Sequence, residues 1–343
     1  MLVALLVAFA AIAQGSSVGM SGATVVYVAD PGEVNVLTFS PVGNDVIVDD
    51  SVPIVPCTGC VQGSDNTMAV CTGTNLTRID ADTGDMDDIV TSAGLIGATL
   101  RGGAGDDVMA GSDGNDALYG DAGIGTISGG LGDYLIGGVG FDTVDYSDRV
   151  VSIVADLDGA SDDGASGQND RNETDVEAIT GGSAADVLDE NKGVNTLNGG
   201  PGDDVLGADS VSYANRTEGL TIKLDGLADD GEAGEADNVH ADIENITGGL
   251  GDDVIHGSAA ANTLFGGPGD DILDGAGGPD VLSGGIGVDT VDYSLRLVGV
   301  SVDLDGIPDD GEPSEGDNVV TDIENIPGGS GADTLRGGGG RTV

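Results

Sequence analysis

The sequence predicts an all-β solenoid, in which short strands and turns repeat along the chain. Three observations support this fold class. Gly accounts for 63 of the 343 residues, well above its usual share of about 7%. Trp is absent, and aromatic residues make up 3% of the chain. From residue 102 onwards, much of the Gly recurs at intervals of nine residues, and a fixed short period of this kind is typical of solenoids.

The charge of the chain excludes one class of partner and suggests another. There are 61 acidic residues against 10 basic ones, which gives a formal net charge of −51. Binding to nucleic acid needs a surface rich in Lys and Arg, so no nucleic-acid partner is expected. A chain this acidic repels itself when it is compact. We therefore expect a multivalent cation to neutralise the chain before it folds.

The first residues resemble a secretion signal. Residues 2–13 form an apolar run that ends in Ala11-Ile12-Ala13. This run is too short to span a bilayer, but it suits a signal peptide over residues 1–13, although no Lys or Arg precedes it. A buried strand or helix is the alternative. Since no other run approaches membrane-spanning length, we expect an extracellular, secreted protein without a membrane span, which could still associate with the cell surface.

Residues 22–100 predict a small N-terminal β cap over the first rung of the solenoid. The segments 23–30, 34–40 and 44–50 are strand-like and are separated by turn residues. A disulfide between Cys60 and Cys71 would close a hairpin-sized loop and staple the cap.

Two further features of this region bear on chemistry. Cys57 and Cys60 match the C-x-x-C pattern of redox proteins, but no βαβ pattern surrounds them, so the disulfide is the favoured interpretation. Residues 77–90 look like a degenerate rung, with Asp85, Asp87 and Asp88 as possible cation ligands.

The repeats provide the main signal. Fourteen units can be cut, in runs that begin at residues 102, 181, 248 and 328. Position 1 is Gly in thirteen units, position 4 is Gly in twelve, and position 8 is always aliphatic or Met. Position 6 is Asp in ten units: Asp107, Asp116, Asp142, Asp186, Asp204, Asp253, Asp271, Asp280, Asp289 and Asp333.

The resulting pattern, G-G-x-G-x-D-x-U-x, resembles the RTX (hemolysin-type) calcium-binding nonapeptide repeat of bacterial secreted proteins. The resemblance implies a parallel β-roll, in which each nonapeptide supplies a turn and a short strand and several Ca²⁺ ions lie between stacked turns. It also implies that the ligands are the ten aspartates above, together with the position-4 glycines Gly105, Gly114, Gly202, Gly251, Gly269 and Gly287.

Elementary chemistry supports this interpretation. Gly reaches positive φ, so the backbone can curl and its carbonyl groups can converge. Asp carries a short carboxylate, and carboxylate and carbonyl oxygens are the ligands that Ca²⁺ prefers. One alternative remains open for any single site, in which the Asp caps its turn through backbone hydrogen bonds and binds no ion. A disordered acidic linker is disfavoured by the phased Gly, Asp and Leu.

Four units depart from the pattern, because Gly125, Tyr134, Asn195 and Asn262 stand at position 6. Asn still offers a neutral oxygen, whereas Gly and Tyr cannot replace a carboxylate. The pattern therefore predicts the weakest sites near residues 120–136, where Asp133 could partly compensate.

A longer repeat overlies the nonapeptides. It divides the chain into modules at 102–180, 181–247 and 248–327, each a nonapeptide run followed by an insert, and a further run starts in 328–343. We expect the inserts to project as β-hairpins or loops. Tyr146, Tyr213 and Tyr293 recur with this period, and we expect them to pack where roll meets insert.

The acidic residues of the inserts do not match a known calcium loop. Asp305, Asp309 and Asp310 lie close together in sequence, but their spacing does not fit an EF-hand. A solvated acidic loop is therefore favoured over an additional site.

No catalytic motif emerges from the sequence. Neither histidine belongs to a His-Glu-x-x-His pattern, and the Gly-x-Ser-x-Gly match at 15–19 lacks the strand–turn–helix context. We therefore expect a calcium-binding protein with a structural or binding role and no catalysis of its own. Two alternatives are a calcium-dependent adhesin or matrix protein, whose partner would be a cell-surface glycan or protein, and the truncated calcium-binding tail of a larger secreted hydrolase or toxin.

Overall fold

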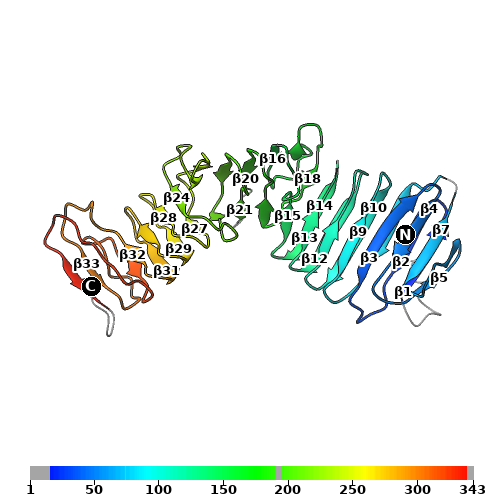
Figure 1. Ribbon diagram of the computed structural model, residues 1–343, viewed down its shortest axis with the longest axis horizontal. Coiled ribbons are helices and arrows are strands. Elements are labelled where there is room, and N and C mark those ends of the chain that lie inside the picture. Colours follow the sequence, from blue (N-terminus) through cyan, green and yellow to red (C-terminus); the bar gives the residue numbers. More distant parts are fainter. Residues whose placement is uncertain (1–15, 74, 131, 191–194, 338–343) are drawn as a thin grey trace. The chain divides into compact units, whose positions relative to one another are not determined.

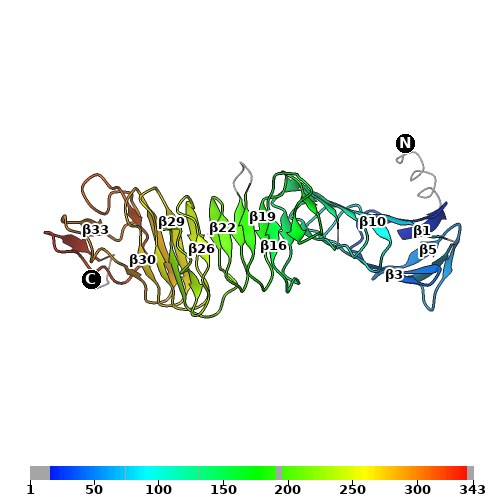
Figure 2. The same cartoon turned by 90° about the horizontal axis from the view of Figure 1, so that it is seen from above.

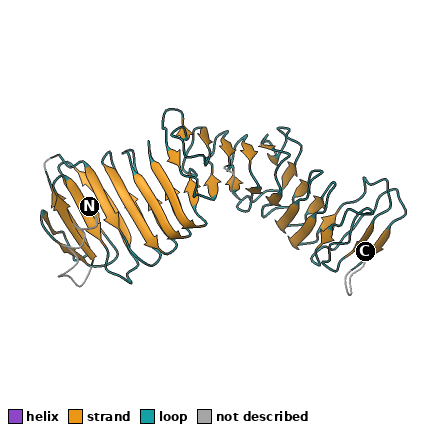
Figure 3. Cartoon of the chain, turned by 180° about the vertical axis from the view of Figure 1, so that it is seen from behind, coloured by secondary structure: helices purple, strands orange, loops and turns teal. Residues whose placement is uncertain are grey.

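The computed structural model describes residues 16–73, 75–130, 132–190 and 195–337, so the predicted signal peptide at 1–13 lies outside the described residues. The described residues form strands and turns and contain no helix (Figure 3). Accordingly, none of them forms a helix long and apolar enough to cross a membrane. The chain divides into two compact units, one comprising the residues up to Asp148 with Ile153–Thr180, the other Arg149–Ser152 with the residues from Gly181 onwards.

The first unit contains two long sheets. The order of strands in one sheet is β5 (Ile54–Pro56), β1 (Ser16–Ser21), β2 (Thr24–Val28), β8 (Arg78–Asp82), β10 (Gly97–Ala104), β12 (Ala117–Gly123), β14 (Tyr134–Gly140) and β18 (Arg171–Asn172). The order in the other is β6 (Cys60–Gln62), β7 (Met68–Thr72), β4 (Asp45–Asp49), β3 (Val36–Val42), β9 (Ile89–Ser92), β11 (Val108–Ala110), β13 (Thr126–Ser128), β15 (Thr143–Asp145) and β19 (Ala178–Thr180). A short pair, β16 (Ile153–Ala155) and β17 (Gly164–Ala165), belongs to the first insert.

The second unit repeats this arrangement with shorter strands (Figure 2). One side carries β21 (Thr196–Asn198), β23 (Ser210–Ser212), β27 (Asn245–Thr247), β29 (Thr263–Pro268), β31 (Val281–Ile286) and β34 (Asn318–Val319). The other strands are β20 (Val187–Asp189), β22 (Val205–Gly207) and β26 (Asn238–Val239), then β25 (Gly231–Glu232), β24 (Leu220–Lys223), β28 (Val254–His256), β30 (Ile272–Asp274) and β32 (Thr290–Val291), and finally β33 (Ser301–Asp303) with β35 (Thr334–Arg336).

The register of the parallel strands explains the nine-residue period. Consecutive nonapeptides alternate between two sheets, so strands two repeats apart pair in parallel, with Leu264 opposite Leu282 and Ile255 opposite Leu273. Because the side chains of a strand alternate between its two faces, the position-8 residues all point inwards. Leu264, Leu273 and Leu282 are fully buried. The all-β class and the parallel β-roll predicted from the repeats are thus confirmed.

The N-terminal end of the first unit differs from the roll that follows it (Figure 1). Strands β3, β4, β7 and β6 pair antiparallel to one another, whereas β8 and β9 already pair in parallel with β10 and β11. The segment 77–90 is therefore part of the roll. Cys60 and Cys71 lie opposite each other on β6 and β7 and form a disulfide, which leaves Cys57 unpaired.

The inserts are enlarged coils of the roll. In the second insert, β24 pairs antiparallel with β25, as a hairpin does, but it also pairs in parallel with the nonapeptide strand β28. Further along the same insert, β26 pairs in parallel with β22. The predicted hairpins are present, but the inserts also contribute rungs to the sheets, because they have to close the same apolar core.

Candidate calcium-binding turns

The aspartates at position 6 lie in the turns, one residue before each short strand. Nine of the ten are buried, with no more than 3% of the residue exposed, and Asp333 is half-buried. Burial of ionised carboxyl groups is costly unless they are hydrogen-bonded or paired with a positive charge. The partners of these carboxylates therefore decide what the turns can bind.

One carboxylate oxygen has the same role in nearly every turn. The Oδ1 atom of Asp289 accepts the backbone N–H of Asp271 at 3.0 Å, and that of Asp271 accepts the N–H of Asp253 at 2.8 Å. The same bond joins Asp186 to Asp204. Each aspartate thus caps the turn that precedes it in the stack. The capping role left open by the sequence is therefore present, but it uses only one oxygen.

The second oxygen occurs in two arrangements. In the first, Oδ2 accepts the N–H of position 2 in its own turn, as at Asp116, Asp186 and Asp253, with distances of 2.6–2.7 Å. In the second, Oδ2 is buried and has no hydrogen-bond partner among the described residues. The carboxylates of the second kind are those of Asp88, Asp107, Asp142, Asp204, Asp271, Asp280 and Asp289.

The glycines create the space that these carboxylates occupy. A Cβ atom added at Gly266, in position 1, would lie well under 3.0 Å from the carboxylate of Asp271. A Cβ atom at Gly269, in position 4, would collide with the carbonyl oxygen of Gly251 in the stacked turn. All the predicted position-4 glycines meet neighbouring backbone atoms at similarly short range: Gly105, Gly114, Gly202, Gly251, Gly269 and Gly287.

The electrostatic state of the turns follows from this burial. Desolvation raises the pKa of Asp107 to about 6, that of Asp280 to about 7 and that of Asp204 to about 8. Neighbouring carboxylates raise them further, with Asp237 acting on Asp204 and Asp317 on Asp280. The charged carboxylates are therefore unfavourable where they stand, and a cation bound between the turns would offset this cost.

The structure gives the shortened repeat at 129–136 a different register from the one that the nine-residue phase predicts. The phase assigns Tyr134 to position 6, but Tyr134 pairs with Ala117 as a strand residue. Asp133 is buried instead, and its Oδ1 accepts the N–H of Asp116 at 2.9 Å. The missing residue is thus lost from the turn, and Asp133 takes the place of the position-6 carboxylate.

The inserts contribute aspartates that the nonapeptide pattern did not identify. Asp170, Asp237 and Asp317 are fully buried, and their Oδ1 atoms accept the N–H groups of Asp133, Asp204 and Asp280 at 2.9–3.1 Å. Each therefore continues a row of turns through an insert. The sequence does hold a signal for two of them, since Asp-Asn-Val at 237–239 and 317–319 matches positions 6 to 8 of the repeat.

The recurring tyrosines contact these insert residues, as expected for packing where roll meets insert. The hydroxyl of Tyr213 donates to Oδ2 of Asp237 at 3.0 Å, and that of Tyr293 donates to Oδ2 of Asp317 at 2.8 Å. Tyr146 instead donates to Oδ1 of Asn172 at 3.1 Å. At Asp237 and Asp317 the second carboxylate oxygen thus accepts a hydrogen bond from a tyrosine hydroxyl.

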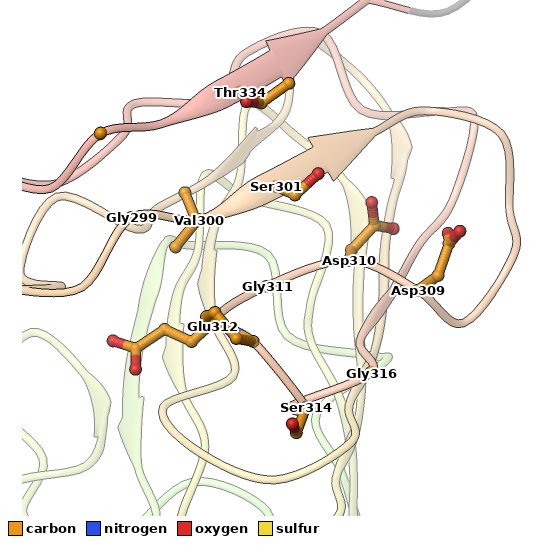
Figure 4. Close-up of a pocket in the computed structure, with 12 residues that line it drawn as sticks. Gly299, Val300, Ser301, Asp309, Asp310, Gly311, Glu312, Ser314, Gly316 and Thr334 are labelled. Carbon is orange, nitrogen blue, oxygen red and sulfur yellow. The ribbon is translucent and has the colours of Figure 1, made fainter.

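The acidic loop of the third insert lies beside a shallow hollow (Figure 4). Asp305 and Asp309 are exposed, and one oxygen of each lies within 4.8 Å of an oxygen of Asp303. Asp310 is buried, and its two oxygens accept the N–H groups of Asp303 and Val319 at 2.7 and 3.0 Å. Asp310 therefore holds the loop together, while the other two side chains extend into solvent.

Comparison with known families agrees with these turns. The family described as the RTX calcium-binding nonapeptide repeat, in its four-copy form, matches residues 96–127, 180–210, 241–273, 265–294 and 322–341. These segments contain every predicted position-6 aspartate except Asp142. No curated protein matches the chain. These segments of the chain are therefore RTX calcium-binding nonapeptide repeats.

Proposed function

We propose that this protein is secreted and folds when Ca²⁺ binds to its repeat turns, so that its role is structural or binding rather than catalytic. The observation that carries the proposal is the row of buried carboxylate oxygens without a partner, as at Asp271 and Asp289. Such atoms are costly in a folded protein unless a ligand satisfies them.

The residues present suit Ca²⁺ as that ligand. The predicted set combines the position-6 carboxylates with carbonyl oxygens of the glycine-rich turns, and these are the oxygen donors that Ca²⁺ takes in groups of six to eight. The close stacking of Gly269 on the carbonyl of Gly251 brings donors of adjacent turns together. Mg²⁺ suits the turns less well, since it requires octahedral geometry and releases its water reluctantly.

Binding should be coupled to folding. Each nonapeptide buries one large apolar side chain, such as Leu273, so the core is thin. Without the ion, these apolar contacts should be too weak to offset both the ordering entropy of the chain and the repulsion among its 61 acidic residues. At low intracellular calcium the chain would stay extended and competent for export, and it would fold at the higher calcium concentration outside the cell.

A calcium titration followed by far-UV circular dichroism tests this proposal. The calcium-depleted chain should show little β signal, and it should gain that signal cooperatively as Ca²⁺ is added. Mg²⁺ at the same concentration serves as the matched control and should produce a much smaller change. A β signal that is independent of Ca²⁺ would refute the coupling.

Secretion rests on a separate observation, the apolar segment 2–13. Expression of the full chain in a bacterial host, followed by N-terminal sequencing of the exported protein, should find cleavage after Ala13. Retention of the intact chain in the cytoplasm would argue against the signal peptide without affecting the calcium proposal.

A further inference from the structure

Two stacked turns with nearly the same sequence differ in the state of their carboxylates. Residues 248–253 read GGLGDD and residues 266–271 read GGPGDD. In the former, Oδ2 of Asp253 accepts the N–H of Gly249 at 2.6 Å. In the latter, Oδ2 of Asp271 is buried without a hydrogen-bond partner. The nonapeptide pattern does not distinguish these turns, so the difference arises from the backbone.

The backbone at position 2 separates the two states. Gly267, in the turn of Asp271, has a φ of +110°, whereas Gly249, in the turn of Asp253, lies outside the positive region. We call turns of the first kind open and turns of the second kind closed. The position-2 residue has positive φ in every described turn with an unpartnered position-6 carboxylate oxygen: Gly84, Gly103, Gly138, Gly200, Gly267, Ala276 and Gly285. It lacks positive φ where its N–H donates to the carboxamide or carboxylate of position 6: Ser112, Gly130, Gly182, Gly249 and Ser258.

The preceding coil explains several of the closed turns. The turns that follow an insert stack on the arginine at its start, and the N–H of Leu250 donates to the carbonyl of Arg216 at 2.8 Å. Ser183 and Ser330 make the same contact with Arg149 and Arg296. The open turn at 266–271 stacks instead on another glycine-rich turn. The closed turns of Asp186 and Asp253 therefore both follow an insert in the stack.

We infer that Ca²⁺ occupies the open turns and that the closed turns are held by their own backbone without a bound ion. This inference rests on the proposed calcium-binding function and specifies which turns carry it. In an open turn a carboxylate oxygen is buried and available, whereas in a closed turn both oxygens already accept hydrogen bonds, as at Asp253. A cation at a closed turn would have to break one of these bonds.

The chain contains a natural comparison. Asn262 stands at position 6 of a closed turn, and its Oδ1 accepts the N–H of Ser258 at 2.8 Å, as the carboxylate of Asp253 does with Gly249. Its Nδ2 donates to the carbonyl of Ile243 at 3.0 Å. A neutral amide therefore completes a closed turn, which shows that the closed geometry needs no negative charge.

The matched variants Asp271→Asn and Asp253→Asn test the inference on the full chain. Bound calcium is counted by elemental analysis after equilibration at a fixed free Ca²⁺ concentration, and by calorimetric titration. We expect Asp271→Asn to lose at least one equivalent of calcium and Asp253→Asn to retain the wild-type number. Equal losses in the two variants, or a loss confined to Asp253→Asn, would overturn the inference.

The variant Asn262→Asp provides a test that does not depend on a loss. It restores the consensus carboxylate in a closed turn, so the sequence pattern predicts an additional ion, whereas the closed geometry predicts an unchanged number. A gain of calcium would refute the inference even if Asp271→Asn failed to fold. Absence of calcium binding by the wild-type chain would instead refute the proposed function itself, so the two failures are distinguishable.

Discussion

The calcium-free chain should respond to pH in a direction that is unusual for an acidic protein. Burial raises the pKa of Asp107, Asp142 and Asp271 to about 6 and that of Asp204 to about 8. In this range of pH the folded state binds more protons than the unfolded state, in which these groups have ordinary values near 3.8. The free energy of unfolding of the calcium-free form must therefore fall as pH rises from about 4 through 8.

The magnitude of this pH dependence follows from the pKa shifts. One pKa unit corresponds to about 1.4 kcal/mol. Lowering the pH from 7.5 to 5 should then stabilise the fold by about 1 kcal/mol for each group whose pKa is about 6. Asp280, with a pKa of about 7, and Asp204, with a pKa of about 8, contribute more. The total is on the order of 10 kcal/mol, comparable with the stability of a whole domain.

The assay is far-UV circular dichroism with thermal melting, in calcium-depleted buffers at pH 7.5 and pH 5 and at low protein concentration. We expect β signal and a melting transition to emerge at pH 5 and to be weak at pH 7.5. With saturating Ca²⁺ the dependence should reverse, because protons compete with the ion for the same carboxylates. A calcium-free chain that is equally structured at both pH values, or more structured at pH 7.5, would refute the reasoning.

Three further predictions, all measured in calcium, test other parts of the structure. Leu264→Ala should cost about 2–5 kcal/mol in urea unfolding, because the side chain is fully buried between stacked rungs, and a change of less than about 1 kcal/mol would contradict that packing. Gly275→Ala should lower the melting temperature by several degrees, since its Cβ would collide with the carboxylate of Asp280, whereas Gly277→Ala in the same turn meets no atom closer than 4.0 Å and should leave it unchanged. Cys71→Ser should cost about 2–4 kcal/mol by removing the disulfide, and reduction of the wild-type chain should reproduce the loss.

The sequence alone predicts the roll because its period fixes several features at once. A repeat of nine residues places one turn and one short strand in each unit. Side-chain alternation then directs position 8 inwards, as Leu264 and Leu273 show. Gly at position 1 and Asp at position 6 follow from the same geometry, because the carboxylate packs back against the glycine. Phase thus predicts the fold class and the aspartates that enter the turns of complete nonapeptides, but it misses Asp133 in the shortened repeat.

The nine-residue phase does not predict the turn aspartates of the inserts, because each insert interrupts that phase. Asp237 lies 33 residues from the Asp204 turn that it caps, whereas the nonapeptide contacts span 18. The phase also does not predict which turns are open and which are closed, for another reason. The turns at 248–253 and 266–271 share their consensus residues, and the difference comes from the coil on which each is stacked. A property set by a neighbour in space is not contained in the local pattern.

The inserts also differ from the open turns in the source of their counter-charge. Arg216 and Arg296 are largely buried and pair with Glu232 and Glu315 at 3.2 Å, and their positive charge opposes the upward pKa shift that burial causes at Asp237 and at Asp317. The phenol groups of the recurring tyrosines occupy the remaining oxygens of these aspartates. Both oxygens of Asp237 and of Asp317 thus have hydrogen-bond partners, whereas Oδ2 of each open-turn aspartate has no hydrogen-bond partner among the described residues. Under the proposed function, the carboxylates that Ca²⁺ would satisfy lie in the nonapeptide runs, and the second and third inserts separate these runs with coils that carry Arg216 and Arg296.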